Sequence, residues 1–220
     1  MSFYSTELSI LQTLASEQLN QLNVRLMVKR DDLIDVEVSG NKWRKLKFNM
    51  EHAQFFQKEG ILTFGGAYSN HLIATAAACA LVGLKSIGIV RGEELTAASN
   101  HNLKRCEELG MHLIFIPRSD YDLRNEKEII ETWKEHYPSY YLVPEGGANF
   151  NGMVGCQEIW KELPTTIQHV FVAQGTTTTS CGILLGMPEN CLLHVVPVLK
   201  GFDVLSTIPS VPPKRTDFPS

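Results

Sequence analysis

Short runs of apolar, often β-branched residues alternate with helical stretches from Ile61 onward, and this alternation constrains the fold more than any other feature. A strand with one solvent-exposed face alternates apolar and polar residues. These runs lack that alternation, as is typical of strands buried on both faces. The expected strands are Ile61–Phe64, Ser86–Val90, His112–Ile116, Tyr140–Val143, His169–Ala173 and Leu192–Leu199. The expected helices are Asn70–Val82, Ala98–Leu109, Leu123–His136, Met153–Leu163 and Thr178–Leu185. Repeated strand–helix–strand units predict a doubly wound α/β fold with a mostly parallel sheet.

The two ends of the chain are less regular. A strand over Arg25–Lys29 precedes an acidic, loop-like stretch, and a helix is expected to begin near Lys42 with Ser39 or Asn41 as its cap. The tail, Ile208–Ser220, holds four of the ten prolines and shows no periodicity. That composition predicts an irregular or disordered end.

Charge and cysteine content exclude several classes of protein. The 220-residue chain has a net charge of −4 and scattered basic residues, so no surface for nucleic acid or anionic lipid is expected. Its five cysteines show no CxxC pair and no metal-ligand spacing, which indicates a reducing compartment and no metal site. The start lacks the features of a signal peptide, and the most apolar stretch, Leu72–Leu84, is too short to span a bilayer. A cytoplasmic protein without membrane or nucleic-acid partners is expected.

A glycine pair followed by polar residues, Gly65–Asn70 (GGAYSN), joins an expected strand to an expected helix. Ligands bind at the carboxyl ends of the strands of a parallel sheet. Glycines let the backbone approach a ligand, and the start of the helix offers free N–H groups to an anion such as a carboxylate. A tight turn with an N-capping residue uses the same residue types, so this motif alone leaves both interpretations open.

A second glycine motif, Gln174–Ser180 (QGTTTTS), also joins a strand to a helix. Backbone N–H groups and threonine hydroxyls at a helix start predict a phosphate site, with Gly175 in the conformation that turns the chain. The segment has no GKS, GKT or GxGxxG, which excludes a Walker P-loop and the dinucleotide fingerprint. A polar turn is the alternative. A third run, Pro144–Asn149 (PEGGAN), follows a strand as well, and by itself it fits a plain loop.

Lys42 lies behind Gly40 at the start of an expected helix. The helix dipole disfavours a cation at that position, which lowers the pKa of the lysine and favours its neutral amine. The neutral amine is the form that makes Schiff bases. For an isolated lysine, an ordinary solvated side chain is the alternative.

Taken together and in order, five runs resemble the 1-aminocyclopropane-1-carboxylate (ACC) deaminase and D-cysteine desulfhydrase family: KRDDL, SGNKWRKLKF, GGAYSNHLIATAAA, PEGGAN and GTTTTSCGI. The resemblance covers Val28 to Asp203 and implies the two-domain α/β fold of the tryptophan synthase β-subunit type, with pyridoxal 5′-phosphate (PLP) as cofactor. By analogy, residues 47–150 form the smaller domain, and residues 1–46 and 151–220 form the larger, cofactor-binding domain. Members of the family run on past Asp203, so the larger domain is expected to lack its C-terminal part.

The resemblance assigns roles to matching residues. Lys42 matches the Schiff-base lysine, and Ser69 matches the serine that meets the substrate carboxylate, so these are the expected catalytic residues. Asn70 matches the asparagine that contacts the phenolic oxygen of the cofactor. Tyr68 and His71 complete the expected substrate-binding set with Ser69 and Asn70. The expected phosphate loop consists of Gly175, Thr176, Thr177, Thr178 and Thr179.

The implied reaction is a PLP-dependent deaminating elimination on a small amino acid, which gives a 2-oxo acid and ammonia. D-Cysteine, which also yields hydrogen sulfide, is favoured over ACC because ring opening in the resembling deaminases depends on side chains beyond this chain. A homodimer is the expected assembly. The main alternative is a non-catalytic protein that binds PLP or another phospho-ligand. A nucleotide-binding α/β protein fits the strand pattern but lacks the fingerprints.

Overall fold

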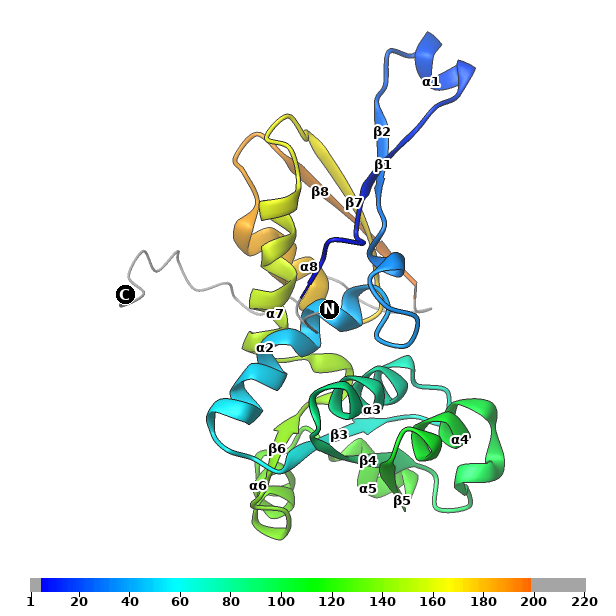
Figure 1. Cartoon of the computed structure of the whole chain (residues 1–220), viewed down its shortest axis with the longest axis vertical. Helices are drawn as coiled ribbons and strands as arrows, with labels where there is room; N and C mark the ends of the chain where they lie inside the picture. The colour runs from blue at the N-terminus through cyan, green and yellow to red at the C-terminus, as the bar shows by residue number, and fades with distance from the viewer. Residues whose placement is uncertain (1–4, 199–220) are drawn as a thin grey trace.

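The computed structural model describes residues 5–198, and a four-stranded parallel sheet in the order β5-β4-β3-β6 forms one half of it (Figure 1). Its strands are β3 (Gly60–Gly65), β4 (Lys85–Arg91), β5 (Met111–Ile116) and β6 (Tyr140–Val143). Every residue of β3 is buried, because β3 lies between β4 and β6. At Gly60 an added Cβ would lie 2.2 Å from the carbonyl oxygen of Lys85, so this start of the strand has room only for glycine.

Helices cover both faces of this sheet, which explains why its strands lack polar alternation. They are α3 (Asn70–Val82), α4 (His101–Glu108), α5 (Arg118–Asp122) and α6 (Lys127–His136). On one face, Ile61 packs against the alanines of α3. On the other face, Leu62 and Phe64 pack against Tyr121 of α5 and Trp133 of α6.

A second, two-stranded parallel sheet is formed by β7 (His169–Gln174) and β8 (Leu192–Pro197), with α8 (Thr178–Gly186) between them in the chain. α7 (Phe150–Gln157) leads into a 3₁₀ helix, η4 (Glu158–Glu162). α2 (Asn41–Phe55) packs closely on α7. The helices are so close at Gly155 that an added Cβ would lie 1.9 Å from the carbonyl oxygen of Arg44. Figure 1 shows α2 running between the four-stranded sheet and the group of α7, α8, β7 and β8.

The N-terminal part is an antiparallel hairpin of β1 (Leu11–Leu14) and β2 (Leu26–Lys29), with the short helix α1 (Glu17–Gln21) at its tip. Ser16 caps α1 by accepting a hydrogen bond from the Leu19 N–H at 3.1 Å. Three further 3₁₀ helices are η1 (Asp31–Leu33), η2 (Ala97–Ser99) and η3 (Glu145–Gly147).

The predicted α/β fold, with mostly parallel sheets flanked by helices, is confirmed. The parallel strands form two sheets instead of one, because the chain leaves β6 through η3 and packs α7 against α2, away from the first sheet. The helix predicted over Leu123–His136 begins only at Lys127, because the preceding residues form a turn in which the Glu126 N–H donates to the Leu123 carbonyl. The hairpin strand β1 and helix α1 were not predicted.

The predicted boundary between two domains, at residues 46 and 47, stays a prediction, and α2 runs across it without a break. The predicted irregular tail and residue Leu199, the predicted end of the last strand, lie outside the described residues. Within residues 5–198, no helix is both long and apolar enough to cross a membrane. In the same residues, no group of three or more His, Cys, Asp or Glu side chains is placed to hold a metal ion.

Candidate active site

α2 begins behind Gly40, whose φ of +62° lies in the left-handed region that favours glycine. Gly40 is the N-cap of this helix and has no side chain to offer to the free N–H groups of the first turn. The prediction that Ser39 or Asn41 caps the helix is therefore wrong. The Nδ2 of Asn41 instead donates to Oγ1 of Thr179 at 3.0 Å, which ties the start of α2 to the start of α8.

Lys42 is half-buried in the first turn of α2, and burial lowers the pKa of its ammonium group. The opposing influences of Cys156 and Glu145 are smaller than the effect of burial. The lowered pKa predicted from the sequence is confirmed, but its leading cause is burial instead of the helix dipole. Among residues 5–198, no hydrogen bond or ion pair engages the Lys42 amine.

A cavity of about 750 Å³ opens beside Lys42. Asn41 and Lys42 of α2 line it together with Asn70 and Ile73 of α3. The other lining residues include the charged side chains of Glu37, Arg105 and Glu108. Cavities of several hundred Å³ hold a cofactor and a small substrate. The structure thus brings together Lys42 and Asn70, two residues that the sequence assigned to the same site from separate motifs.

The turn between β3 and α3 carries three of the predicted site residues, Tyr68, Ser69 and Asn70. Ser69 is the N-cap of α3, and its Oγ accepts a hydrogen bond from the Leu72 N–H at 3.3 Å. Tyr68 is 78% exposed, and Asn70 is exposed as well. Of the predicted substrate-binding residues only Asn70 lines the cavity beside Lys42; Tyr68, Ser69 and His71 do not.

His71 belongs to α3, and its side chain, only 2% exposed, points to Thr63 of β3. Thr63 Oγ1 donates its one proton to the Val143 carbonyl at 2.8 Å and lies 2.9 Å from His71 Nε2, so Nε2 carries a proton. Burial, with the nearby charges of Lys42 and Lys45, lowers the pKa of His71 to about 3. The ring is therefore neutral, and a contact of His71 with substrate would have to use its backbone N–H.

The predicted phosphate loop lies between the end of β7 and the start of α8. Gly175 has no positive φ, and a Cβ added to it would meet only the Val198 side chain, at 4.0 Å. The expectation that this turn needs glycine is therefore wrong, because the local backbone suits any residue. Thr177 is the N-cap of α8 but makes no side-chain capping bond, which leaves the N–H groups of the first helical turn free to donate hydrogen bonds to an anion.

Lys45 lies next to the predicted phosphate loop, although no motif in the sequence assigned it a role. Its Nζ donates to Oγ1 of Thr176 at 2.9 Å, and the residue is only 1% exposed. Burial, and secondarily the charge of Lys42, lowers the pKa of Lys45 to about 8. Lys45 follows Lys42 by three positions, a spacing that places two side chains on the same side of a helix. That spacing was the available signal for Lys45.

The PEGGAN run after β6 completes the surroundings of Lys45. Gly146 and Gly147 have φ values of +67° and +68°, which favour glycine. A Cβ added to Gly147 would lie 3.0 Å from the Lys45 Cβ, and one added to Gly146 would lie 3.2 Å from the Thr176 side chain. The loop that fitted a plain turn in the sequence thus packs directly against the phosphate loop and Lys45.

The charges of this region fit an anionic ligand. Within residues 5–198, no carboxylate forms an ion pair with Lys42 or Lys45, although both are largely buried. Buried ammonium groups are costly unless a negative charge compensates them. The phosphate of PLP, next to Thr176 and the start of α8, would supply that charge.

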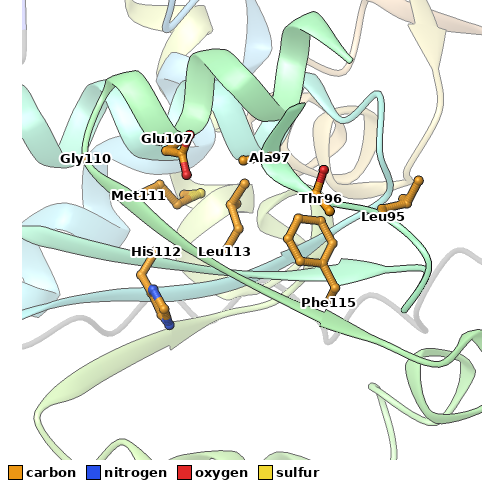
Figure 2. A pocket seen from close by; sticks show the side chains of 9 residues that line it. All are labelled: Leu95, Thr96, Ala97, Glu107, Gly110, Met111, His112, Leu113 and Phe115. Carbon is orange, nitrogen blue, oxygen red and sulfur yellow. The ribbon is translucent and has the colours of Figure 1, made fainter. Parts of the chain in front are cut away.

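A second cavity, of about 510 Å³, lies beside β5 (Figure 2). Apolar side chains dominate its lining, among them Leu95, Met111, Leu113 and Phe115. Figure 2 shows the His112 ring directed away from Met111 and Leu113. No predicted site residue lines this cavity, so the cavity beside Lys42 is the candidate active site.

Comparisons with known proteins agree with this geometry. A putative ACC deaminase of Pyrococcus abyssi is 32% identical over 193 residues, which cover 84% of this chain and 57% of that protein. The bifunctional D-cysteine desulfhydrase/ACC deaminase of Arabidopsis thaliana, a mitochondrial protein, is 32% identical over 178 residues, or 73% of this chain and 44% of that protein. The chain spans about half the length of the curated relatives it matches.

A solved structure of an ACC deaminase homologue has the same fold, with a TM-score of 0.74 and 26% identity over 90% of this chain and 62% of that one. A family model described as pyridoxal-phosphate dependent enzyme matches residues 5–203. The resemblance to ACC deaminases and D-cysteine desulfhydrases, and the expectation of a PLP-dependent family, are confirmed. The chain belongs to the family of pyridoxal-phosphate dependent enzymes.

Proposed function

We propose that this chain binds PLP in the cavity beside Lys42 and uses it for a deaminating elimination on a small amino acid. The products are a 2-oxo acid and ammonia, with hydrogen sulfide when the substrate is D-cysteine. The observation that carries the proposal is the pair of largely buried amines, Lys42 and Lys45, between a cavity and the hydroxyl-rich start of α8. D-Cysteine and ACC are the first substrates to test, because two similar proteins carry these names.

Each end of the cofactor has residues that suit it. Lys42 Nζ, with its lowered pKa, would hold the cofactor covalently. The phosphate would bind to Lys45, to Thr176 and to the free N–H groups at the start of α8. Asn70, which lines the same cavity, would donate to the cofactor's phenolic oxygen.

The chain's own residues would then orient the substrate and move protons. When bound, PLP supplies an electron sink that stabilises negative charge on carbon. The first turn of α3 would bind the substrate carboxylate: Ser69 Oγ accepts from the Leu72 N–H and keeps its own proton to donate, and Asn70 lines the cavity. Lys42, as a neutral amine, takes a proton from the substrate carbon and returns it. Burial keeps Lys42 suited to this task, because it favours the uncharged form.

The rival function is a protein that binds PLP or another phospho-ligand without catalysis. It is the second candidate because the chain spans only about half the length of its relatives. Titration of the purified protein with PLP, followed by D-cysteine or ACC, separates the two functions. An enzyme gives a visible absorption band that changes with substrate, together with release of 2-oxo acid and ammonia. A stable band without product over many hours supports a non-catalytic PLP-binding protein, and no band at all contradicts PLP binding in either function.

Replacing Ser69 by alanine is expected to lower kcat/KM about tenfold to hundredfold, because one hydrogen bond to a charged carboxylate is worth about 1.5–3 kcal/mol. The variant also loses the cap of α3, which costs about 1 kcal/mol of stability. Steady-state kinetics and thermal melting are measured on the same samples. Ser69→Thr, which keeps a capping hydroxyl, is the control. A lower Tm with unchanged kcat/KM would limit Ser69 to its capping role.

Replacing Gly175 by valine is expected to weaken PLP binding while leaving the fold intact. The backbone there does not need glycine, so the effect comes from side-chain bulk near the approaching phosphate. Single changes of Thr176, Thr177 or Thr178 to alanine are expected to be milder, since each removes one hydroxyl among several donors. PLP titration compares the four variants. Normal binding by Gly175→Val with loss of binding in a threonine variant would contradict a site built mainly from backbone N–H groups.

The affinity for inorganic phosphate is expected to fall as the pH rises through about 8, the pKa to which burial lowers Lys45. Below that pH Lys45 is charged and attracts the anion, and above it the amine is neutral. The loss amounts to roughly tenfold between pH 7 and pH 9. In the ligand-free protein the sign is opposite: the unfolded chain binds more protons, so the free energy of unfolding rises with pH between about 8 and 10.5. Calorimetric titration checks the affinity, and a flat profile in Lys45→Met is the expected control.

The finer expectations on assembly, domains and location stay predictions. They are a homodimer, the division into residues 47–150 and the remainder, and a cytoplasmic location. The mitochondrial Arabidopsis relative shows that a protein of this type is also found in an organelle.

A further inference from the structure

Arg44 lies on the opposite side of α2 from Lys42, because two positions along an α-helix turn the side chain through about half a turn. The residue is only 2% exposed although it is charged. Its guanidinium donates to both oxygens of Asp31, at 2.6 and 2.7 Å, and to both oxygens of Glu162, at 2.8 and 3.0 Å. Bidentate pairs fix the orientation of an arginine more closely than a single hydrogen bond does, so this side chain has one defined position.

The two carboxylates that hold Arg44 have further partners of their own. Ser9 Oγ donates to Asp31 in η1 at 2.6 Å, and Lys29 Nζ pairs with Glu162 in η4 at 2.7 Å. Arg44 and Lys29 balance the charges of Asp31 and Glu162, so these four side chains together have no net charge. The effect of the group on the neighbouring lysines of α2 is therefore one of position instead of electrostatic field.

The first turn of α2 needs such support from outside the helix. Gly40 offers it no capping side chain, and no acidic residue lies in this turn. Lys42 and Arg44 are basic residues near the start of a helix, where the macrodipole disfavours positive charge. The local sequence therefore does not fix the start of this helix, and contacts with distant segments have to do so.

Distant segments hold the backbone of this turn as well. The Arg44 carbonyl lies so close to Gly155 of α7 that the helix cannot move further in that direction. The Gly40 N–H donates to the Asp31 carbonyl at 3.1 Å, so the residue that binds the Arg44 side chain also binds the start of the helix. Loss of the Arg44 side chain would leave this turn free to rotate or to shift away from α7.

We infer that Arg44 is a positioning residue of the candidate active site: held by Asp31 and Glu162, it fixes the first turn of α2. Lys42 lines the cavity and Lys45 meets Thr176 only while this turn keeps its rotation. Arg44 itself does not line the cavity, so it acts through these two lysines. The inference rests on the proposed function, because the position of Lys42 matters for its reaction with PLP. A misplacement of about 1 Å can slow a reaction about a hundredfold.

The rate at which the absorption band forms after mixing with PLP, and the lysine labelled on borohydride reduction, test this role. Arg44→Met is expected to slow the band about tenfold to hundredfold and to divide the label between Lys42 and Lys45. Arg44→Lys keeps the charge but loses the planar fork that binds two carboxylates, so it is expected to be slowed as well. Parent-like behaviour of Arg44→Lys would show that charge alone matters and would overturn the inference.

The matched control is Ile89→Ala in β4, which creates a cavity in the core of the other sheet. It is expected to melt at a lower temperature, yet to react at the parent rate with a single label on Lys42. A general loss of stability would slow both proteins alike, so equal slowing in Ile89→Ala would overturn the inference.

Far-UV circular dichroism checks that each variant folds. If Arg44→Met does not fold, Glu162→Gln decides in its place, because it weakens one of the two anchors and leaves Asp31; slowing of about tenfold is expected. A folded Arg44→Met or Glu162→Gln protein with the parent rate and a single label on Lys42 contradicts this inference alone. A parent protein that forms no band contradicts the proposed function, and the inference with it.

Discussion

Replacing Lys42 by alanine is expected to abolish turnover of D-cysteine or ACC, with a loss of about 10⁴-fold or more. The variant removes the half-buried amine that, in the proposed function, would hold the cofactor covalently and move the substrate proton. The visible absorption band of protein-bound PLP is expected to disappear with it. Absorption spectra during PLP titration and coupled assays for the 2-oxo acid measure the two effects separately.

Lys47→Ala is the matched control for this variant. Lys47 lies on the same helix but points to Glu158, with which it forms an ion pair. Its loss is expected to leave the absorption band and kcat/KM near the parent values, because Lys47 does not line the cavity beside Lys42. Residual turnover in Lys42→Ala equal to that of Lys47→Ala would remove Lys42 from the mechanism.

Replacing Lys45 by methionine is expected to weaken PLP binding by roughly tenfold to hundredfold, the equivalent of one charge-assisted hydrogen bond of about 1.5–3 kcal/mol. Lys45 lies beside Thr176 with 1% of its surface exposed, so water replaces little of the lost interaction with phosphate. Methionine keeps the length and flexibility of the side chain, which preserves packing against Gly147. PLP titration followed by absorption or fluorescence measures the affinity.

The ligand-free Lys45→Met protein is expected to melt at the parent temperature or above it, because the change removes a buried charge without a carboxylate partner. This separates a binding defect from unfolding. Inorganic phosphate serves as a second probe, and its affinity is expected to fall in parallel with that of PLP. Parent-like affinity for both ligands would show that the phosphate binds away from Lys45 and Thr176.

The fold was predictable from the sequence where a helix or strand leaves a hydrophobic pattern in its own residues. The runs at Ile61–Phe64 and Ser86–Val90 are mostly apolar because helices cover both faces of the first sheet, and this pattern is visible in the sequence. The hairpin strand β1 and helix α1 were missed because they are four and five residues long and mostly exposed. Such elements carry no periodic signal. The splitting of the parallel strands into two sheets depends on how α7 packs against α2, which no local pattern records.

The site was predictable only in part, for a related reason. Lys42 and Asn70 stand next to glycine motifs, and the structure places both on one cavity. Lys45 gains its role from burial and from Thr176, a residue far away in the sequence. His71 follows Asn70 directly, yet its ring turns inward to Thr63, because successive residues of a helix face different directions. Gly146 and Gly147 have the positive φ values that favour glycine, whereas Gly175 does not. The sequence does not show which of these glycines the backbone requires.

Borohydride reduction of the protein with PLP bound, followed by peptide mapping, tests the central claim most directly. Lys42 and Lys45 are both largely buried, lie within one helical turn and have lowered pKa values. Either amine could therefore react with the cofactor, and the experiment distinguishes them. The predicted result is a single cofactor label on Lys42, because Lys42 lines the cavity whereas Lys45 is engaged with Thr176. A label on Lys45 or on any other lysine, or no stable label at saturating PLP, would contradict the assignment of this site.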